Sequence, residues 1–398
     1  MSGTAAGGLA GGAPGEEYRG ALGAIAPALL EYWFRDRYFE TRIDISSSGV
    51  ENYTLGELRA LLEIPFGELD TIAFRDSPSR GSEELGQAIR AHVAPESRHA
   101  VVATHGSSEA IFLAMAALLR PGDQVVIPRP GYQSLTSTVA ALGAEPVAWP
   151  LAQGQDFAPD LDELERLLTP HTRMVVANFP HNPTGASLDA GAYLRFVELI
   201  DSSPCYLLWD ASLAMMAYEG NPLPDPSCLL ERCVSTGTLS KAYGLPGLRV
   251  GWCLAPEDVA CSMVRVRDYT TLNTSPLSEY LATAVLRHTD RVLGPRVRQA
   301  EENRRIVMAW ARRHAEVVQC PPPRGGVTVF PRIDGLTSTR PLCERLLTER
   351  GVLLVPGDCF GYPDRVRLGF GGQSAELVAG LDELASAIAD ARDGADAA

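Results

Sequence analysis

Lys241 is the only lysine in this chain of 398 residues, and arginine supplies the other 34 of its 35 lysine and arginine residues. Arginine keeps its proton at physiological pH, whereas a lysine amine can lose its proton and attack a carbonyl carbon. Hydroxyl side chains precede the lysine within the segment Gly237 to Trp252, and glycines and an arginine follow it. A solvated surface lysine is the alternative. We predict that Lys241 is catalytic and forms an imine with a carbonyl.

A carboxylate stands at the end of a separate apolar segment, Cys205 to Asp210. An imine-forming lysine with such an aspartate suggests pyridoxal phosphate, whose ring withdraws electrons only while its nitrogen is protonated and so needs a carboxylate beside it. Asp210 is predicted to fill that place, or else to cap a helix after a strand. Asn182 can donate a hydrogen bond to the phenolic oxygen of the ring, although an Asn-Pro-Thr-Gly sequence also simply forms turns.

Several hydroxyls and one cation are predicted to bind the cofactor phosphate. Phosphate binds the backbone amides at a helix N-terminus, together with hydroxyls and cations. Ser107 and Ser108 are expected to open a helix directly after a strand. Thr238 and Ser240 flank the lysine, and Arg249 follows it eight residues later. These five residues are the predicted phosphate site.

Further candidates lie elsewhere in the chain. Tyr132 is predicted to stack on the pyridine face, a core tyrosine being the alternative. Arg367 can bind an α-carboxylate through two parallel hydrogen bonds, and Arg365 is the fallback because it would share a strand face with Arg367. His105 and His181 are candidate acids or water-binding groups, with purely structural roles as the alternative.

Composition excludes several classes of function. The chain has 45% hydrophobic residues, enough for one large and one smaller domain, and no apolar run approaches the roughly 20 residues that span a bilayer. A net charge of −14 argues against nucleic-acid binding and is compatible with a cationic substrate. Eight scattered cysteines without ligand spacing indicate no metal site and a reducing cytoplasm. Residues 1–15 lack the basic region of a signal peptide.

The elements that position these residues follow an α/β pattern. From residue 100, short β-branched apolar runs alternate with helical periodicity, which predicts an α/β sheet with ligands beyond the carboxyl ends of its strands. Helices are expected to start near Ser107, Leu161 and Ser187. The predicted strands are Ala100–Thr104, Gln124–Pro128, Arg173–Asn178, Cys205–Asp210, Cys233–Thr238 and Arg249–Leu254.

The C-terminal third predicts a second, α+β unit. The chain reads as one long helix from Pro276 to about His314, followed by short strands and two amphipathic helices. The aromatic and charged segment Leu29–Phe39 is expected to pack against this unit or a partner chain. We therefore expect a disordered lead-in at 1–20, an N-terminal segment at 21–46, a large cofactor-binding domain at 47–290 and a small domain at 291–398.

Taken jointly, these residues resemble the fold-type I, pyridoxal-phosphate-dependent class I/II aminotransferase family over roughly residues 40 to 390. The resemblance rests on His181–Gly185, Asp210, the Ser-Lys pair followed by Leu245–Trp252, and the late Arg367. It implies a large domain with a mostly parallel seven-stranded sheet between helices and a smaller α+β C-terminal domain. It also implies pyridoxal phosphate as cofactor and a homodimer with composite active sites.

Within that family, the segments Asp44–Val50, Asn52–Leu61 and Thr104–Ala110 resemble the capreomycidine synthases and their relatives in streptolidine formation. Those enzymes cyclise hydroxylated arginines for viomycin-like peptide and streptothricin-type antibiotics. The resemblance implies a lyase that converts 3-hydroxyarginine or 3,4-dihydroxyarginine to capreomycidine or hydroxycapreomycidine, by loss of water and addition of the guanidine. It also makes Gly49 a predicted substrate contact. The number of hydroxyls and the stereochemistry at Cβ stay open.

Two positions depart from the aminotransferase pattern. Leu213 stands where the family has a tyrosine on the ring oxygen. Asp76 stands five residues before Gly81, where the family has a tyrosine that reaches the neighbouring chain's cofactor phosphate. A carboxylate repels phosphate but attracts a guanidinium, so Asp76 is predicted to bind the substrate, a loop aspartate being the alternative.

Two other functions compete with cyclisation. An ordinary aminotransferase for a basic amino acid would use the same residues. A regulator with an aminotransferase-like domain would need a DNA-binding region, and the roughly 40 residues before the domain are too few and contain no basic cluster.

Overall fold

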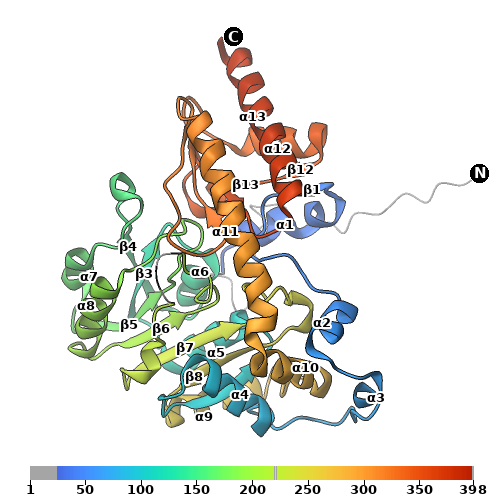
Figure 1. Cartoon of the computed structure of the whole chain (residues 1–398). Coiled ribbons are helices and arrows are strands. Elements are labelled where there is room, and N and C mark those ends of the chain that lie inside the picture. The colour runs from blue at the N-terminus through green and yellow to red at the C-terminus, as the bar shows by residue number, and fades with distance from the viewer. Residues whose placement is uncertain (1–24, 219, 221, 397–398) are drawn as a thin grey trace, which may run out of the picture.

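A seven-stranded sheet forms the centre of the computed structural model, which describes residues 25–218, 220 and 222–396 (Figure 1). The strand order is β2-β8-β7-β6-β5-β3-β4, and β8 alone runs antiparallel to the other strands of this sheet. The strands are β2 (Ala100–Thr104), β3 (Gln124–Arg129), β4 (Glu145–Pro150), β5 (Thr172–Ala177), β6 (Tyr206–Asp210), β7 (Cys233–Thr238) and β8 (Gly251–Ala255).

The predicted α/β sheet is confirmed, and each of the six predicted strands overlaps a strand of the structure. The sequence prediction missed β4, which contains Pro146 and Pro150. Proline lacks the N–H that a central strand must donate, so it is tolerated at a sheet edge, and β4 is an edge strand.

Helices cover both faces of this sheet because its buried side chains alternate between two apolar clusters. In β3, Val125 and Ile127 join the cluster that contains α5, whereas Val126 joins the cluster that contains α8. The surrounding helices are α4 (Glu83–Val93), α5 (Ser107–Leu118), α6 (Gln133–Ala141), α7 (Leu161–Leu167), α8 (Ala190–Asp201), α9 (Glu257–Arg267) and α10 (Pro276–Arg287).

Two of the three predicted helix starts agree with the structure, since α5 begins at Ser107 and α7 at Leu161. The third helix, α8, begins at Ala190 rather than near Ser187. Asp189 fixes this start, because its Oδ1 accepts a hydrogen bond of 2.8 Å from the backbone N–H of Ala192.

The chain continues into a second group of elements, most of which lies above the sheet in Figure 1, while its long orange helix runs down past the sheet. The single long helix predicted from Pro276 is wrong: α10 and α11 are separate helices that meet at His288, whose φ of −131° is not helical. The two helices have different packing partners, α4 for α10 and α13 for α11, so the chain must change direction between them. The other helices and strands of this group are α11 (Thr289–Arg313), α12 (Arg340–Arg350), α13 (Ser374–Asp396), β9 (Val318–Gln319), β10 (Thr328–Val329), β11 (Arg332–Ile333), β12 (Val352–Leu353), β13 (Val355–Pro356) and β14 (Val366–Gly369).

The N-terminal helix α1 (Leu29–Glu40) touches both groups of elements. The Trp33 indole donates a hydrogen bond of 3.0 Å to the carbonyl of Leu354, and the backbone N–H of Leu29 donates one of 2.8 Å to Gln133 Oε1. The predicted lead-in at 1–20 lies outside the described residues, and the predicted domain boundaries stay predictions. The remaining elements are β1 (Ile43–Asp44), which pairs with β12, α2 (Leu55–Leu62), α3 (Phe66–Leu69) and short 3₁₀ turns at Gln153–Gln155, Pro226–Cys228, Pro246–Leu248 and Gly357–Phe360.

Candidate active site

A cavity of about 710 Å³ lies at the edge of the sheet where the parallel strands end. Segments far apart in the sequence converge there, because β5, β6 and β7 are parallel neighbours whose carboxyl ends share one edge. Ten of the predicted site residues line it: Gly49, Ser107, Ser108, Tyr132, Asn182, Asp210, Ser240, Lys241, Arg249 and Arg367.

Lys241 lies in this cavity with its amine held in place. Its Nζ donates a hydrogen bond of 2.9 Å to Ser48 Oγ. Burial, and then the guanidinium of Arg367, lower the pKa of Lys241 to about 8. A lysine with this pKa is partly neutral near physiological pH and can act as a nucleophile or a base. Ser48 was not predicted, because nothing in the sequence placed residues 46–48 beside the lysine.

The Asp210 carboxylate is buried at the end of β6. Its Oδ1 accepts hydrogen bonds from the Ser212 hydroxyl at 2.6 Å and the Ser212 backbone N–H at 3.0 Å. Burial raises the pKa of Asp210, whereas the bonds from Ser212 and the charge of Lys241 favour its ionised form. A cation beside this carboxylate, such as a protonated ring nitrogen, would keep it ionised.

Asn182 is positioned by a chain of hydrogen bonds next to Asp210. Asn178 donates from Nδ2 to the backbone carbonyl of Asp210 at 3.0 Å, and its Oδ1 accepts from the backbone N–H of Asn182 at 3.0 Å. Asn182 Oδ1 in turn accepts from Arg367 at 3.4 Å. The amide nitrogen of Asn182 is therefore the end that can donate to a ligand in the cavity.

The N-terminus of α5 has the features that an anion site needs. Gly106 precedes the helix with a φ of +83°, and no side chain caps the first turn. Its backbone N–H groups are therefore available to a phosphate. Arg249 lies against this turn, donating to the His105 carbonyl at 3.1 Å and to Ser240 Oγ at 3.2 Å.

Two glycines allow Arg249 and α5 to approach this closely. A Cβ on Gly106 would lie 2.5 Å from Arg249 Nη2, and a Cβ on Gly251 would lie 2.5 Å from the carbonyl carbon of Gly106. Thr238, also predicted for the phosphate, does not line the cavity. Its hydroxyl donates to Ser240 Oγ at 2.9 Å and so holds a residue that does.

Arg367 extends into the cavity from β14 and is almost fully buried. Its Nη2 donates to the Ser46 carbonyl at 2.8 Å, its Nε has no hydrogen-bond partner, and burial lowers its pKa to about 10. An anionic ligand would therefore satisfy this guanidinium. The fallback candidate, Arg365, lies outside the cavity, where it donates to the Phe330 carbonyl at 2.9 Å and covers the Phe157 ring.

Helix α1 forms one wall of the cavity, with Glu31, Phe34 and Tyr38. The hydroxyl of Tyr132 donates a hydrogen bond of 3.0 Å to Glu31 Oε1. Sequence reasoning missed Glu31. It assigned this segment to packing, because the aromatic residues of α1 gave no sign that one of its carboxylates faces the lysine's cavity.

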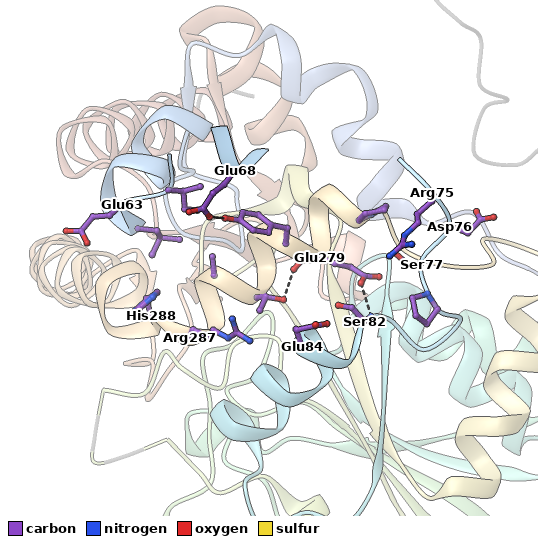
Figure 2. A pocket seen from close by; sticks show the side chains of 17 residues that line it. Glu63, Glu68, Arg75, Asp76, Ser77, Ser82, Glu84, Glu279, Arg287 and His288 are labelled. Atoms are coloured by element: carbon purple, nitrogen blue, oxygen red, sulfur yellow. Dashed lines mark hydrogen bonds between the residues drawn. The ribbon is translucent and has the colours of Figure 1, made fainter. Parts of the chain in front are cut away.

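Asp76 does not line the cavity that contains Lys241. It lines a second cavity of about 940 Å³, and Figure 2 shows it beside Arg75 and Ser77 at one side of that cavity. Asn273 donates to Asp76 Oδ1 at 3.4 Å. The two cavities have no lining residue in common. Within one chain Asp76 therefore does not reach Lys241, and its predicted role depends on a partner chain.

The two candidate histidines do not line the lysine's cavity either. His105 Nδ1 lies 3.3 Å from Glu109 Oε2, and His181 Nδ1 lies 2.9 Å from the Thr184 hydroxyl. Burial lowers the pKa of His181 to about 3, so this ring is neutral at physiological pH. Leu213 does line the cavity, where a tyrosine would have supplied a hydroxyl.

Pyridoxal phosphate fits this arrangement. Lys241 offers an amine for the aldehyde, Asp210 a carboxylate for the ring nitrogen, and the uncapped α5 turn with Ser240 and Arg249 a site for the phosphate. Among the described residues, no three His, Cys, Asp or Glu side chains are grouped to bind a metal ion. In the same part of the chain, no helix has the length and apolar character needed to cross a bilayer.

Relatives of known structure share this fold. The chain aligns with the pyridoxal-phosphate-dependent cyclase OrfR at a TM-score of 0.86 and 39% identity, covering 92% of this chain and 97% of OrfR. It aligns with a pyridoxal-phosphate-dependent aminotransferase from Streptococcus suis at a TM-score of 0.86 and 28% identity, covering 92% and 98% of the two chains.

Relatives identified by sequence belong to the same group of enzymes as the structural relatives. Capreomycidine synthase from Streptomyces vinaceus is 50% identical over 375 residues, which cover 93% of this chain and 96% of that enzyme. An aspartate aminotransferase from Pyrococcus horikoshii is 28% identical over 294 residues, covering 72% and 75%. Residues 71–387 match the family model for aminotransferase class I and II. The chain therefore belongs to the class I and II aminotransferase family, as a fold-type I enzyme that uses pyridoxal phosphate.

Proposed function

We propose that this enzyme is a cyclase that removes water from a 3-hydroxylated arginine and closes the guanidine onto Cβ, giving capreomycidine or its hydroxylated form. The observation that carries the proposal is the 50% identity to capreomycidine synthase over 93% of the chain. The aspartate aminotransferase from Pyrococcus horikoshii is much less similar, at 28% identity. An ordinary aminotransferase for a basic amino acid is therefore the weaker alternative.

Several of the charged residues in the cavity have separate roles in the proposed reaction. Pyridoxal phosphate, when bound, supplies the electron-withdrawing ring that stabilises negative charge at Cα. Asp210 keeps the ring nitrogen protonated, and Arg367 binds the α-carboxylate. The Lys241 amine, with its pKa lowered to about 8, removes the Cα proton.

Ring closure then needs only proton transfers from the protein. The Cβ–O bond breaks and the hydroxyl leaves as water, with Lys241 or a nearby acid supplying the proton. A guanidine nitrogen of the same substrate forms a bond to Cβ and gives a proton back to the group that protonated the hydroxyl, and Lys241 returns a proton to Cα. Since nucleophile and electrophile belong to one molecule, the effective concentration is very high when the cavity folds the side chain correctly.

The leucine at position 213 does not by itself select this reaction. Without a tyrosine hydroxyl there, the ring oxygen lacks one hydrogen bond, worth about 1 kcal/mol. That difference is too small to abolish either cyclisation or transamination. The contacts that fold the substrate side chain must therefore decide between the two reactions.

The proposal extends to assembly and setting. We expect a homodimer with composite active sites, acting in the cytoplasm in the formation of a viomycin-like or streptothricin-type antibiotic. All eight cysteines are free, which suits a reducing compartment. Sedimentation equilibrium of the holoenzyme tests the assembly, because a fully active monomer would contradict composite sites and any reach of Asp76 into a partner's cavity.

Product analysis tests the reaction. The holoenzyme is incubated with 3-hydroxyarginine and with 3,4-dihydroxyarginine, first without and then with an added keto acid, and the masses of the products are measured by mass spectrometry. Loss of one water with formation of a ring supports the cyclase, and the better substrate shows how many hydroxyls the enzyme requires. Exchange of the amino group for a keto group, dependent on an added keto acid, would establish the aminotransferase instead. Lys241→Arg is the inactive control.

A further inference from the structure

Five charged side chains are found among the described residues that line the active-site cavity: Glu31, Asp210, Lys241, Arg249 and Arg367. The chemistry above uses four of them, for the ring nitrogen, proton transfer, the phosphate and the α-carboxylate. Glu31 is the charged residue that this chemistry leaves without a role. Of the two carboxylates among these five residues, Asp210 is assigned to the cofactor and Glu31 is not.

The position of Glu31 is fixed by its neighbours. Its helix is held on either side of it, by the bond from the Leu29 N–H to Gln133 Oε1 at 2.8 Å and by the bond from Trp33 to the Leu354 carbonyl at 3.0 Å. The Tyr132 hydroxyl donates to Glu31 Oε1 at 3.0 Å. Burial raises the pKa of Tyr132, so its hydroxyl stays protonated and remains a donor. The carboxylate is therefore positioned before any ligand enters.

Glu31 also lies close to the residues that bind and transform the substrate. Phe34 follows it by one turn on α1, and the Arg367 guanidinium lies 5.7 Å from the centre of the Phe34 ring. Burial lowers the pKa values of both Lys241 and Arg367, and the negative charge of Glu31 opposes part of that effect at each. A molecule held by its α-carboxylate on Arg367 thus has Glu31 within the same cavity for a cation on its side chain.

We infer that Glu31 binds the guanidinium of the substrate and selects amino acids with a cationic side chain. This assignment rests on the proposed function, and it names the recognition group for that substrate. A guanidinium matches a carboxylate through two parallel N–H···O bonds, which a neutral side chain of the same shape cannot form with equal strength. With both ends of the substrate held, the chain between them is bent within the cavity, which is what ring closure onto Cβ requires.

A binding experiment on the holoenzyme tests the assignment without needing turnover. L-Arginine and L-citrulline have nearly the same shape, but only arginine carries a cationic side chain, and neither has a β-hydroxyl to lose. Their dissociation constants are measured by calorimetry for the wild type and for Glu31→Gln. Glutamine keeps the length of the side chain and an oxygen that accepts from Tyr132. Glu40→Gln, at the end of α1 and outside the cavity, is the matched control.

The wild type is expected to prefer arginine by roughly tenfold or more, the effect of one hydrogen bond to a charged group. Glu31→Gln should lose that preference while its affinity for citrulline stays unchanged, and Glu40→Gln should keep it. A Glu31→Gln enzyme that still prefers arginine, or a wild type without any preference, would overturn the assignment. Loss of the preference in Asp76→Asn but not in Glu31→Gln would place the guanidinium at Asp76 of a partner chain.

The same preparations separate this inference from the proposed reaction. A wild type that prefers arginine through Glu31, yet releases no cyclised product from hydroxylated arginines, refutes the reaction and leaves Glu31 as the recognition residue. A wild type that cyclises while Glu31→Gln keeps the arginine preference refutes the role of Glu31 alone.

Discussion

The apoenzyme is expected to capture pyridoxal phosphate at a rate that rises with pH and levels off near pH 8. Lys241 must be neutral to attack the aldehyde, and its pKa is lowered to about 8, first by burial and then by Arg367. A lysine with a lowered pKa loses its proton at a lower pH. The neutral, reactive form therefore predominates above about pH 8, and the rate falls tenfold for each pH unit below it.

The size of this effect follows from the shift itself. At pH 7 a lysine with a pKa of about 8 is neutral in about one molecule in eleven. At the ordinary value of 10.5, only about one in 3,000 would be neutral. The cavity thus raises the reactive fraction by about 300-fold at neutral pH.

The assay removes the cofactor, mixes apoenzyme with pyridoxal phosphate in a stopped-flow instrument from pH 6 to 10, and follows the visible absorption of the bound form. Free Nα-acetyl-lysine reacting with the same aldehyde serves as the reference. The reference rate is expressed per neutral amine of Nα-acetyl-lysine, and dividing the enzyme rate by it then cancels the titration of the cofactor. Lys241→Arg checks that the signal comes from this residue, since it should give no bond that borohydride can trap.

A rate that keeps rising in proportion to hydroxide up to pH 10 would refute the reasoning, because Lys241 would then have an ordinary pKa. Arg367→Met gives a second check. It removes the nearest like charge, so it should move the plateau to higher pH while leaving its height unchanged. An unchanged plateau pH would show that burial alone sets the pKa.

Three further substitutions probe the cofactor site. Asp210→Asn should keep the cofactor but slow exchange of the substrate Cα proton with deuterated solvent by about 10- to 100-fold, because one charge-assisted hydrogen bond is lost. Exchange at the normal rate would show that Asp210 does not act on the ring nitrogen. Arg249→Gln should instead weaken cofactor retention in dialysis by about tenfold, and a defect identical to that of Asp210→Asn would contradict this division of roles. Gly251→Ala would place its Cβ 2.5 Å from the Gly106 carbonyl carbon and should lower the free energy of unfolding by about 1–3 kcal/mol in a denaturant titration. Gly86→Ala, with nothing within 4 Å, is its control and should be neutral or stabilising.

The sequence predicted the fold well where a single physical pattern dominates. The predicted strands Gln124–Pro128 and Cys205–Asp210 overlap β3 and β6, because a strand that is buried on both faces is mostly apolar. The pattern failed for β4, whose prolines suit an edge that only the sheet order reveals. It also failed at His288, because helical periodicity runs through both α10 and α11 and does not show that they pack on different partners.

For the site, the sequence indicated residues that follow strands or carry rare chemistry. Lys241 and Asp210 were placed by the predicted strands that precede or contain them, Arg249 by its distance from the lysine in the sequence, and all three line the cavity. Ser48 and Glu31 were missed because tertiary packing alone brings a loop and the N-terminal helix over the lysine. Thr238 flanks the lysine in the sequence as Ser240 does, yet only Ser240 lines the cavity, and the Thr238 hydroxyl donates to Ser240 Oγ.

The antiparallel direction of β8 has a consequence for how such an enzyme can change over evolution. Because β8 runs against β7 as its neighbour, the loop between them, residues 239–250, carries both Lys241 and Arg249 and lies against the first turn of α5. Other residues that line the cavity come from other segments: Glu31 from α1, Ser48 from the loop before α2 and Arg367 from β14. Mutations in α1, the loop before α2 and β14 can therefore change which substrate is accepted, while the loop that carries Lys241 and Arg249 still binds the cofactor.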